Sequence, residues 1–455
     1  MMMKFELRHI ILILILAIMT GCTDTPVPAV APSPDTAARP LSFTLSSATV
    51  EPASRSLEYE GLNTSFTEGT MIGCVIAFKD AEADGGYAYQ ANSCWKWHRD
   101  GLLLHKLYDA DNSLVYHAAK PDETTVENTL IRHFTAEELA EQQPDAEPDP
   151  HAPYYIKLLN ETADYAFFFY YPYIDAEVLT TAVAKANGKS DDYGYTLYQW
   201  TGLAVENTLA FYVGNNSEAD LTTKLAPWTQ YPVIPLDDFS KGTGQERLEN
   251  SDFMYGAVTE MPNEQPLNAE NAKSEIPVTL QKQMVTMDFL FSETPDEGSV
   301  IFKPTSANHN YSMVRIRYFN MLTGKFDGEA PYEQYSSDQL KSNARYNKDI
   351  YPGKIDPVIE DKVEYTVYRV ILTPQSASDL IGKDWEGKES SCDFTFKTNG
   401  EQHTLKHIAR NPLLTELKGG YYYRLRFSKT GDDTGWHLTI DDWKEGGNTT
   451  LTRPD

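Results

Sequence analysis

The stretch YAFFFYYPY (165–173) decides the fold class of this chain. It is a continuous, mostly aromatic run without a charge, and Pro172 marks the end of the strand because proline cannot donate to a β ladder. A continuous apolar run of this kind is typical of a strand that is buried on both faces. The alternative is that the rings from Phe167 to Tyr173 form an exposed platform on which a carbohydrate stacks.

Similar runs of β-branched and aromatic residues recur almost to the end of the chain, with turn residues between them. They are LSFTLSSATV (41–50), MIGCVIAF (71–78), NTLAFYV (207–213), VTMDFLF (285–291), MVRIRYF (313–319), EYTVYRVILT (364–373), CDFTFK (392–397), YYYRLRF (421–427) and WHLTI (436–440). In the first run, Leu41, Phe43 and Leu45 alternate with hydroxyl residues, which is the pattern of a half-buried strand. The sequence therefore predicts a mainly β protein built from sandwiches.

Helical patterns are few and short. They are TAEELAEQQ (135–143), DAEVLTTAVAKA (175–186) and SSDQLKSNARYNK (336–348), which we interpret as insertions between strands. Thr135 is expected to cap the first helix, ahead of Glu137 and Glu138.

The chain is long enough for two domains. About 430 residues would remain after removal of an N-terminal signal, which is more than one hydrophobic core usually covers. The stretch MPNEQPLNAENAKSE (261–275) is polar and lacks periodicity, so we place the boundary there. This predicts an N-terminal β-sandwich over 41–262 and a C-terminal one over 272–455.

The first residues have the pattern of an export signal. Lys4 and Arg8 precede an apolar run of about ten residues, which is short of the roughly 20 that a membrane-spanning helix needs. Small Gly21 before Cys22 resembles a bacterial lipoprotein cleavage box, so 1–21 is predicted to be removed and Cys22 to be acylated. The alternative is an ordinary signal peptide with an incidental cysteine.

Residues 22–40 are rich in Pro, Ala, Ser and Thr and read as an extended, disordered tether. Within it the triplet Asp35-Thr36-Ala37 resembles an O-glycan acceptor pattern, with Thr36 as the acceptor. The alternative is that these are plain linker residues.

Net charge and cysteine content indicate which partners and which cellular compartment suit the protein. The formal net charge of -27 disfavours binding to nucleic acid or to anionic lipid and suits a cell-surface protein. Acylation of Cys22 would leave Cys74, Cys94 and Cys392, an odd number in a compartment where disulfides persist. Cys74 and Cys94 are close enough in sequence to be bridged across neighbouring strands, and the alternative is two buried free thiols.

The sequence contains no recognisable catalytic constellation. It has no phosphate-binding glycine-rich loop before a helix, no HExxH, no GxSxG and no paired CxxC. His98, His105 and His117 lack the spacing of a metal site and are interpreted as surface or structural histidines. The stretch DADNS (109–113) begins like a calcium loop but lacks the glycine and the bidentate glutamate that such a loop needs. We therefore expect no enzyme, no metal site and no cofactor.

Nine short motifs follow one another in an order that resembles the fimbrillin family of Bacteroidetes. They are the lipobox at Cys22, ASRS (53–56), SFTEGTMIGCVIAF (65–78), YQAN (89–92), YAFFFYYPY (165–173), DFMYG (252–256), LTPQ (372–375), GGYYYRLRF (419–427) and WHLTIDDWKEG (436–446). Each is weak alone, but together they span nearly the whole chain. The chain departs from the family at Thr70, where the family has Asp, and in DFLF (288–291), which lacks the family's histidine.

The resemblance implies two transthyretin-like antiparallel β-sandwich domains in tandem and a structural role as a fimbrial subunit or accessory subunit. Such a subunit reaches the cell surface as an outer-membrane lipoprotein, where an arginine-specific protease cuts after an arginine that follows the first strand. The matching residue is Arg55, followed by Ser56, whereas Arg39 is a poor alternative because Pro40 follows it. The alternative for Arg55 is an ordinary surface arginine.

In the family's mechanism the first strand leaves, and a strand of another fimbrial subunit fills the groove by β-strand addition. Loss of 41–50 would expose unpaired backbone groups and apolar side chains, each worth roughly 1.5 to 3 kcal/mol when reburied. The tail KEGGNTTLTRPD (444–455) has one large apolar residue, Leu451, and is a poor donor. Either 436–443 is the donor, or the protein accepts a strand and donates none, as a tip subunit would.

A second hypothesis places the protein in a nutrient-uptake system as a surface lipoprotein that binds glycans. It would keep its first strand and its lipid, and it would use exposed aromatic residues such as Trp95, Trp97, Trp200 and Trp228. An adhesive role in the first hypothesis also implies a ligand on a host or bacterial surface.

Overall fold

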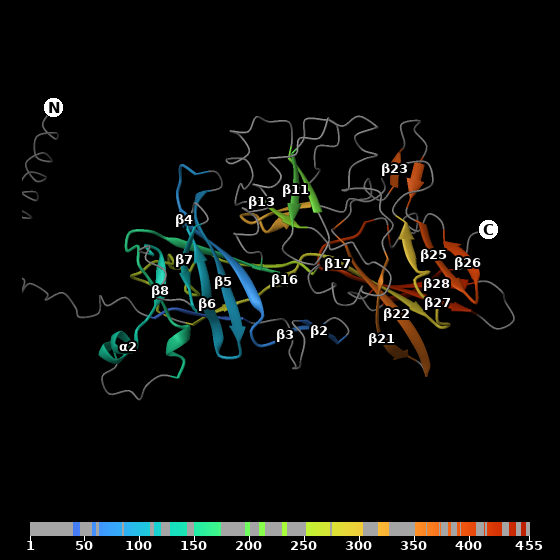
Figure 1. Cartoon of the computed structure of the whole chain (residues 1–455), viewed down its shortest axis with the longest axis horizontal. Coiled ribbons are helices and arrows are strands. Elements are labelled where there is room, and N and C mark those ends of the chain that lie inside the picture. The colour runs from blue at the N-terminus through green and yellow to red at the C-terminus, as the bar shows by residue number, and fades with distance from the viewer. Residues whose placement is uncertain are drawn as a thin grey trace, which may run out of the picture. The chain divides into compact units, whose positions relative to one another are not determined.

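Two groups of β-sheets make up the described part of the chain, as the computed structural model shows (Figure 1). The structure describes residues 40–45, 57–60, 63–83, 86–109, 113–119, 128–142, 150–173, 196–200, 209–213, 230–233, 252–273, 275–303, 317–326, 351–360, 362–372, 374, 381–383, 389–391, 393–405, 414, 416–429, 436–442 and 447–451. Strands dominate these residues, so the prediction of a mainly β-sandwich protein is confirmed.

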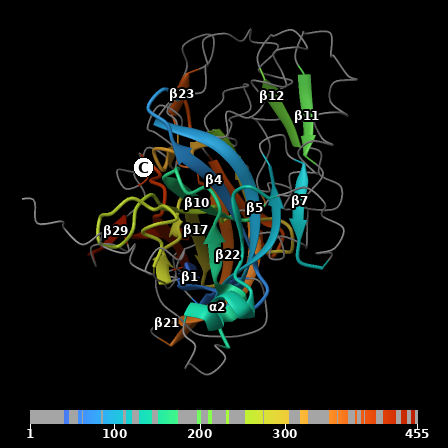
Figure 2. The same ribbon diagram turned by 90° about the vertical axis from the view of Figure 1, so that its left-hand side faces the viewer.

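The first group is built on a seven-stranded antiparallel sheet in the order β16-β14-β10-β4-β5-β6-β7. Its strands are β4 (Met71–Lys79), β5 (Tyr87–His98), β6 (Gly101–Tyr108), β7 (Leu114–His117), β10 (Tyr165–Tyr171), β14 (Met254–Val258) and β16 (Gln281–Lys282). Figure 2 shows β10, β4 and β5 side by side, as their pairing requires.

Strand β10 is buried on both faces, as predicted. All seven of its residues are buried, and alternate side chains enter two different hydrophobic clusters. Tyr165, Phe167 and Phe169 face one cluster, whereas Phe168 and Tyr170 face the other. The stretch 165–171 is therefore core, and the interpretation of its rings as a carbohydrate platform is wrong.

A second layer covers one face of this sheet. It contains β1 (Ser42–Leu45), β15 (Glu275–Val278), β8 (Ile131–His133) and β9 (Ile156–Leu158). Leu41 joins β1 to β9 through an antiparallel bridge with Ile156. Apolar side chains of both layers form one cluster, which makes this half a β-sandwich.

Shorter elements lie between these strands along the chain. They are β2 (Leu57–Glu60), β3 (Asn63–Phe66), α2 (Ala136–Gln142), the 3-10 turn η3 (Ala152–Tyr154), β11 (Thr196–Trp200), β12 (Leu209–Val213) and β13 (Gln230–Val233). The predicted helix at 135–143 is confirmed by α2. The helices predicted at 175–186 and 336–348 lie outside the described residues.

The second group is a sandwich of a six-stranded and a three-stranded sheet. The larger sheet runs β21 (Gly353–Glu360), β22 (Val363–Leu372), β17 (Val285–Phe291), β27 (Tyr422–Lys429), β28 (Trp436–Asp442) and β29 (Gly447–Leu451). The smaller runs β18 (Ile301–Lys303), β25 (Asp393–Thr398) and β26 (Glu401–Leu405). Two small sheets remain. In one, β19 (Arg317–Asn320) pairs with β13 and with β20 (Lys325–Phe326), and the other consists of β23 (Ile381–Lys383) and β24 (Glu389–Ser391).

Phenylalanine rings fill the space between these two sheets. Phe289 of β17 stacks on Phe394 of β25 with ring centroids 4.3 Å apart. Phe291 stacks on Phe427 of β27 at 4.8 Å and meets Phe396 edge-on at 4.9 Å. Such ring pairs contribute beyond the area that they bury, and aliphatic side chains such as Val370 and Leu425 complete this core.

Two strand pairings depart from the predicted all-antiparallel arrangement. Strand β1 runs parallel to β15, and β17 runs parallel to β27. Parallel neighbours need long connections, and in both cases the paired strands are far apart in sequence. The alternating patterns at 41–50 and 285–291 indicate strands but carry no information on the direction of their partners.

The polar stretch at 261–275 packs tightly against the first sandwich. Leu267 is fully buried and its carbonyl accepts a hydrogen bond from the Tyr165 amide at 2.6 Å. Beyond the stretch, β15 and β16 still pair with β1 and β14. Residues 39–455 form one compact unit, and the division into 41–262 and 272–455 stays a prediction.

Candidate functional site

The candidate functional site is the place of β1 in the second layer of the first sandwich. The Leu41 amide donates to the Ile156 carbonyl at 3.2 Å, and the Ile156 amide donates to the Leu41 carbonyl at 2.7 Å. From Ser42 to Leu45, β1 then pairs with β15, with Phe43 opposite Ile276. Strand β1 and the residue before it thus bond to two elements that lie more than a hundred residues away along the chain.

Phe43 anchors β1 in an aromatic pocket. Its side chain is fully buried, and its ring lies 4.9 Å from Phe167 and 5.1 Å from Phe169, measured between centroids. Trp95 of β5 meets the ring of Phe43 nearly perpendicularly at 5.7 Å. The neighbouring Leu41 is fully buried as well. Strand β1 therefore contributes an essential part of the core although it is only four residues long.

Hydrogen bonds hold the pocket wall in place. The indole Nε1 of Trp95 donates to the Ser93 hydroxyl at 2.9 Å, and that hydroxyl donates to the Cys74 carbonyl at 2.8 Å. Because Trp95 and Ser93 are fully buried, these bonds fix the ring in one orientation. The sequence hypothesis that Trp95 is an exposed glycan-binding ring is wrong.

The same hypothesis also named Trp97, Trp200 and Trp228 as exposed glycan-binding rings. Trp97 is half-buried and packs against the hydrophobic cluster that contains Phe43 and Trp95. Trp228 lies outside the described residues, as does the side chain of Trp200.

Gly101 lets the start of β6 approach β1 closely. Its φ of +142° lies in a region that other residues rarely adopt. A Cβ at this position would lie 3.2 Å from the Phe43 carbonyl oxygen and 3.6 Å from the Cβ of Tyr154. The backbone around β1 thus depends on a glycine that the sequence analysis did not single out.

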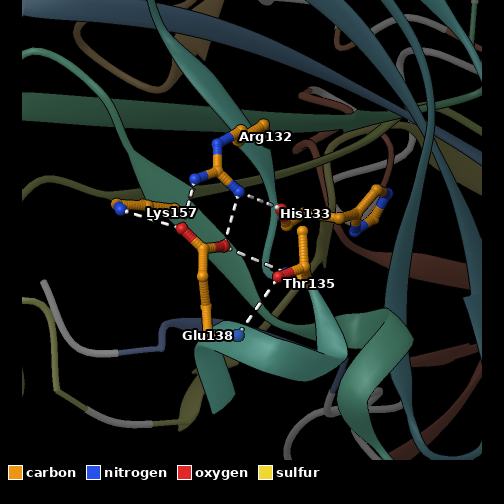
Figure 3. A network of polar contacts seen from close by, with 5 residues as sticks. All are labelled: Arg132, His133, Thr135, Glu138 and Lys157. Carbon is orange, nitrogen blue, oxygen red and sulfur yellow. Dashed lines mark hydrogen bonds and ion pairs between the residues drawn. The ribbon is translucent and has the colours of Figure 1, made fainter. Parts of the chain in front are cut away.

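A network centred on Glu138 ties α2 to the paired strands β8 and β9, of which β9 bonds to Leu41 (Figure 3). The Glu138 carboxylate accepts hydrogen bonds from Arg132 Nη1 of β8 at 2.7 Å and from Lys157 Nζ of β9 at 3.1 Å. The Thr135 amide donates to Glu138 Oε2, and the Glu138 amide donates to Thr135 Oγ1, each at 3.1 Å. This is a capping box, and it confirms Thr135 as the predicted cap.

One carboxylate therefore links the helix to both β8 and β9. Hydrogen bonding to Arg132 holds the pKa of Glu138 well below its usual range. Strand β9 carries both Lys157 and Ile156, the partner of Leu41, so the network supports the backbone to which β1 bonds.

We expect Glu138→Gln to lower the free energy of unfolding by about 1 kcal/mol at neutral pH, because the amide keeps the cap but loses the ion pairs. The folded-state pKa of Glu138 is depressed, so its contribution is fully present above its unfolded pKa of about 4.3 and is lost as pH falls through the folded pKa. Urea unfolding at several pH values should show that the difference in free energy of unfolding between variant and wild type decreases below about pH 4.

The exposed neighbour Glu137 supplies the control. Glu137→Gln should leave stability nearly unchanged at every pH. A loss in Glu138→Gln that persists undiminished in acid would contradict the ion-pair account.

The structure contradicts the predicted bridge between Cys74 and Cys94. In the register of β4 and β5, Cys74 lies opposite Ser93, and Cys94 lies opposite Gly73. Adjacent register positions point to opposite faces of a sheet, so the two thiols are separated by the sheet itself. Both are buried and no disulfide joins them. Nearness in sequence did not reveal this one-residue offset.

We expect both thiols to resist alkylation in the folded protein and to react once urea unfolds it. Burial raises the pKa of the Cys74 thiol, so little reactive thiolate forms there. Peptide mapping after labelling measures each cysteine separately. A non-reduced digest that contains a cross-linked Cys74–Cys94 peptide would overturn this account.

The histidines singled out in the sequence lie in two separate places. His98 Nε2 contacts the Glu68 carboxylate, and its Nδ1 lies 3.3 Å from Asp100 Oδ2. The rings of His105 and His117 lie 5.1 Å apart on β6 and β7, and burial lowers the pKa of His105 to about 4. Within the described ranges, no three His, Cys, Asp or Glu side chains gather as a metal site would require.

Several predicted sites lie outside the described residues: Cys22, Thr36, Arg55, Ser56 and Cys392. In sequence, Arg55 and Ser56 fall between the end of β1 and the start of β2. Among the helices that the structure describes, none has the length and apolar character to span a membrane.

Comparison with known proteins gives distant structural likenesses only. No family model matches the chain, and no curated protein matches it either. A putative cell adhesion protein from Bacteroides ovatus is 12% identical, with 90% of this chain and 98% of that chain covered and a TM-score of 0.39. One from Bacteroides uniformis is 10% identical, with coverages of 83% and 93% and a TM-score of 0.36.

The tip fimbrial protein Mfa3 from Porphyromonas gingivalis is 8% identical, with coverages of 83% and 95% and a TM-score of 0.33. The chain is thus similar to fimbrial and putative cell adhesion proteins of Bacteroidetes. At such low TM-scores the likeness is remote, and the geometry of β1 supports the functional proposal instead.

Proposed function

We propose that this protein is a subunit of a bacterial cell-surface fimbria and that it is assembled by strand exchange at the site of β1. The observation that supports this most directly is the place of Phe43. A short N-terminal strand supplies a fully buried aromatic anchor to the core and bonds to β9 and β15. Removal of such a strand leaves a groove with unsatisfied backbone groups and an empty pocket, which favours entry of another strand.

Maturation would follow from the position of Arg55. An arginine-specific protease would hydrolyse the peptide bond between Arg55 and Ser56, which lie between β1 and β2 in the sequence. The segment that ends at Arg55 carries Cys22, Thr36 and β1. One cut therefore releases the chain from an acylated Cys22 and frees the groove at the same time. Before the cut, the protein would be an outer-membrane lipoprotein.

The subunit would accept a strand without donating one. Strand β29 pairs with β28, and its five residues include one large apolar side chain, Leu451. A strand with so little apolar surface would recover little burial energy in the groove of a neighbour. This favours a tip or accessory position, where an adhesive surface would face a host or bacterial ligand. The role is structural rather than catalytic.

The proposal is tested by treating the purified full chain with an arginine-specific protease. We expect a single early cut at Arg55, release of β1, and binding of a strand from another subunit. Arg55→Gln should resist this cut, whereas Arg39→Gln, the matched control, should behave like the wild type because Pro40 makes that bond a poor substrate. Cleavage of both variants at the same rate, or retention of β1 after the cut, would contradict the proposal.

A further inference from the structure

The pocket around Phe43 is built for an aromatic ring. Three rings from two strands enclose it, namely Trp95 of β5 and Phe167 and Phe169 of β10. Trp95 and Phe169 meet the Phe43 ring at interplanar angles of 87° and 67°, the edge-to-face geometry that aromatic pairs prefer. An aliphatic side chain in this place would lose these contacts, and alanine would leave a cavity.

The pocket wall is fixed before any strand enters. The hydrogen bonds from Trp95 to Ser93, and from Ser93 to the Cys74 carbonyl, lie entirely within β4 and β5. Phe167 and Phe169 lie on β10, whose partners are β4 and β14. Since none of these hydrogen bonds and strand pairings involves β1, we expect the pocket to keep its shape when β1 leaves and to discriminate between incoming side chains.

The second anchor lies two residues earlier. Leu41 is fully buried, and its amide and carbonyl bond to Ile156. Ser42, between the two anchors, is also buried at 5% exposure, which favours a small residue there. The register fixes direction as well, because Phe43 and Leu45 lie opposite Ile276 and Val278 in a parallel pairing.

We infer that the groove selects an extended segment of a different subunit that carries an aliphatic residue, a small residue and an aromatic residue in succession and that runs parallel to β15. This inference rests on the proposed function. The C-terminal residues 436–455 of this chain contain no aliphatic residue followed two positions later by an aromatic one. A second copy of this chain therefore lacks a matching C-terminal strand, and the occupant comes from another subunit type.

The test measures peptide binding to the full chain after cleavage at Arg55. The probe is a fluorescent peptide with the sequence of residues 40–49, PLSFTLSSAT, followed by anisotropy. We expect the Phe43→Ala peptide to bind at least about 100-fold more weakly, as expected for loss of a buried aromatic side chain. A Thr44→Ala peptide, altered at a half-buried position of the same strand, is the control and should bind within about threefold of the unmodified peptide. A peptide of residues 444–455 should fail to compete.

The outcomes separate the two claims. If the unmodified peptide does not bind the cleaved chain, the strand-exchange function is wrong, and this inference falls with it. If the unmodified peptide binds but the Phe43→Ala peptide binds equally well, or the 444–455 peptide competes as strongly, strand exchange stands and the aromatic specificity is overturned.

Discussion

Replacing Phe43 with alanine should lower the free energy of unfolding of the uncleaved chain by about 3 to 5 kcal/mol. The ring is fully buried between Trp95, Phe167 and Phe169, and the fixed pocket wall cannot collapse into the space that it leaves. Urea unfolding measures the loss. Hydrogen exchange of the Ile156 amide should accelerate as well, because that amide donates to Leu41.

Thr44→Ala is the matched control for this prediction. It alters the neighbouring residue of the same strand at a half-buried position, so its effect should be within about 0.5 kcal/mol. Equal stability of the Phe43→Ala and Thr44→Ala proteins would mean that β1 is not anchored in the core. The strand-exchange proposal would then lose its physical basis.

The second large effect is expected on the other face of the six-stranded sheet, where β17 and β22 bury an ion pair. Arg369 Nε lies 2.6 Å from Asp288 Oδ1, and Arg369 Nη2 lies 2.8 Å from Asp288 Oδ2. Both side chains are 3% exposed or less, and the Tyr422 hydroxyl also donates to Asp288. This bidentate geometry is the strongest form of an ion pair between an arginine and a carboxylate.

Arg369→Met should therefore lower the free energy of unfolding by about 3 to 5 kcal/mol, because it removes the bidentate partner of the buried Asp288 carboxylate, while Arg424, opposite Asp288 on β27, is paired with Glu360. The double variant Asp288→Leu, Arg369→Met should recover most of that loss, since both charges are then absent. Urea unfolding at neutral pH compares the two.

The exposed pair of Glu293 and Lys429, with side chains 35% and 39% exposed, serves as the control. Glu293→Gln should cost less than about 1 kcal/mol. A loss of that small size in Arg369→Met would mean that solvent reaches Asp288, and the account of a dry pair would be wrong.

Local patterns in the sequence predicted the elements whose signal is carried by neighbouring residues. The aromatic run at 165–171 indicated a strand buried on both faces, and β10 has that burial. The spacing of Thr135 and Glu138 indicated a capped helix, and the two residues form the reciprocal bonds of a capping box. The alternation of Leu41, Phe43 and Leu45 indicated the inward face of β1.

Features that depend on which strands become neighbours were beyond reach of the sequence. The ion pair of Asp288 and Arg369 joins residues 81 positions apart and needs the register of β17 against β22. The same lack of register led to the wrong bridge between Cys74 and Cys94. Trp95 follows Ser93 and Cys94 and precedes Lys96, a mixed pattern with no sign that its ring forms the wall of the Phe43 pocket.

The most direct test of strand exchange is the N-terminal sequence and intact mass of the protein taken from cell surfaces and sheared fimbriae. Strand exchange requires a chain that starts at Ser56, without β1 and without an acylated Cys22. Protein in assembled fimbriae that still starts at acylated Cys22 would contradict it, because the groove of β1 would then never have opened.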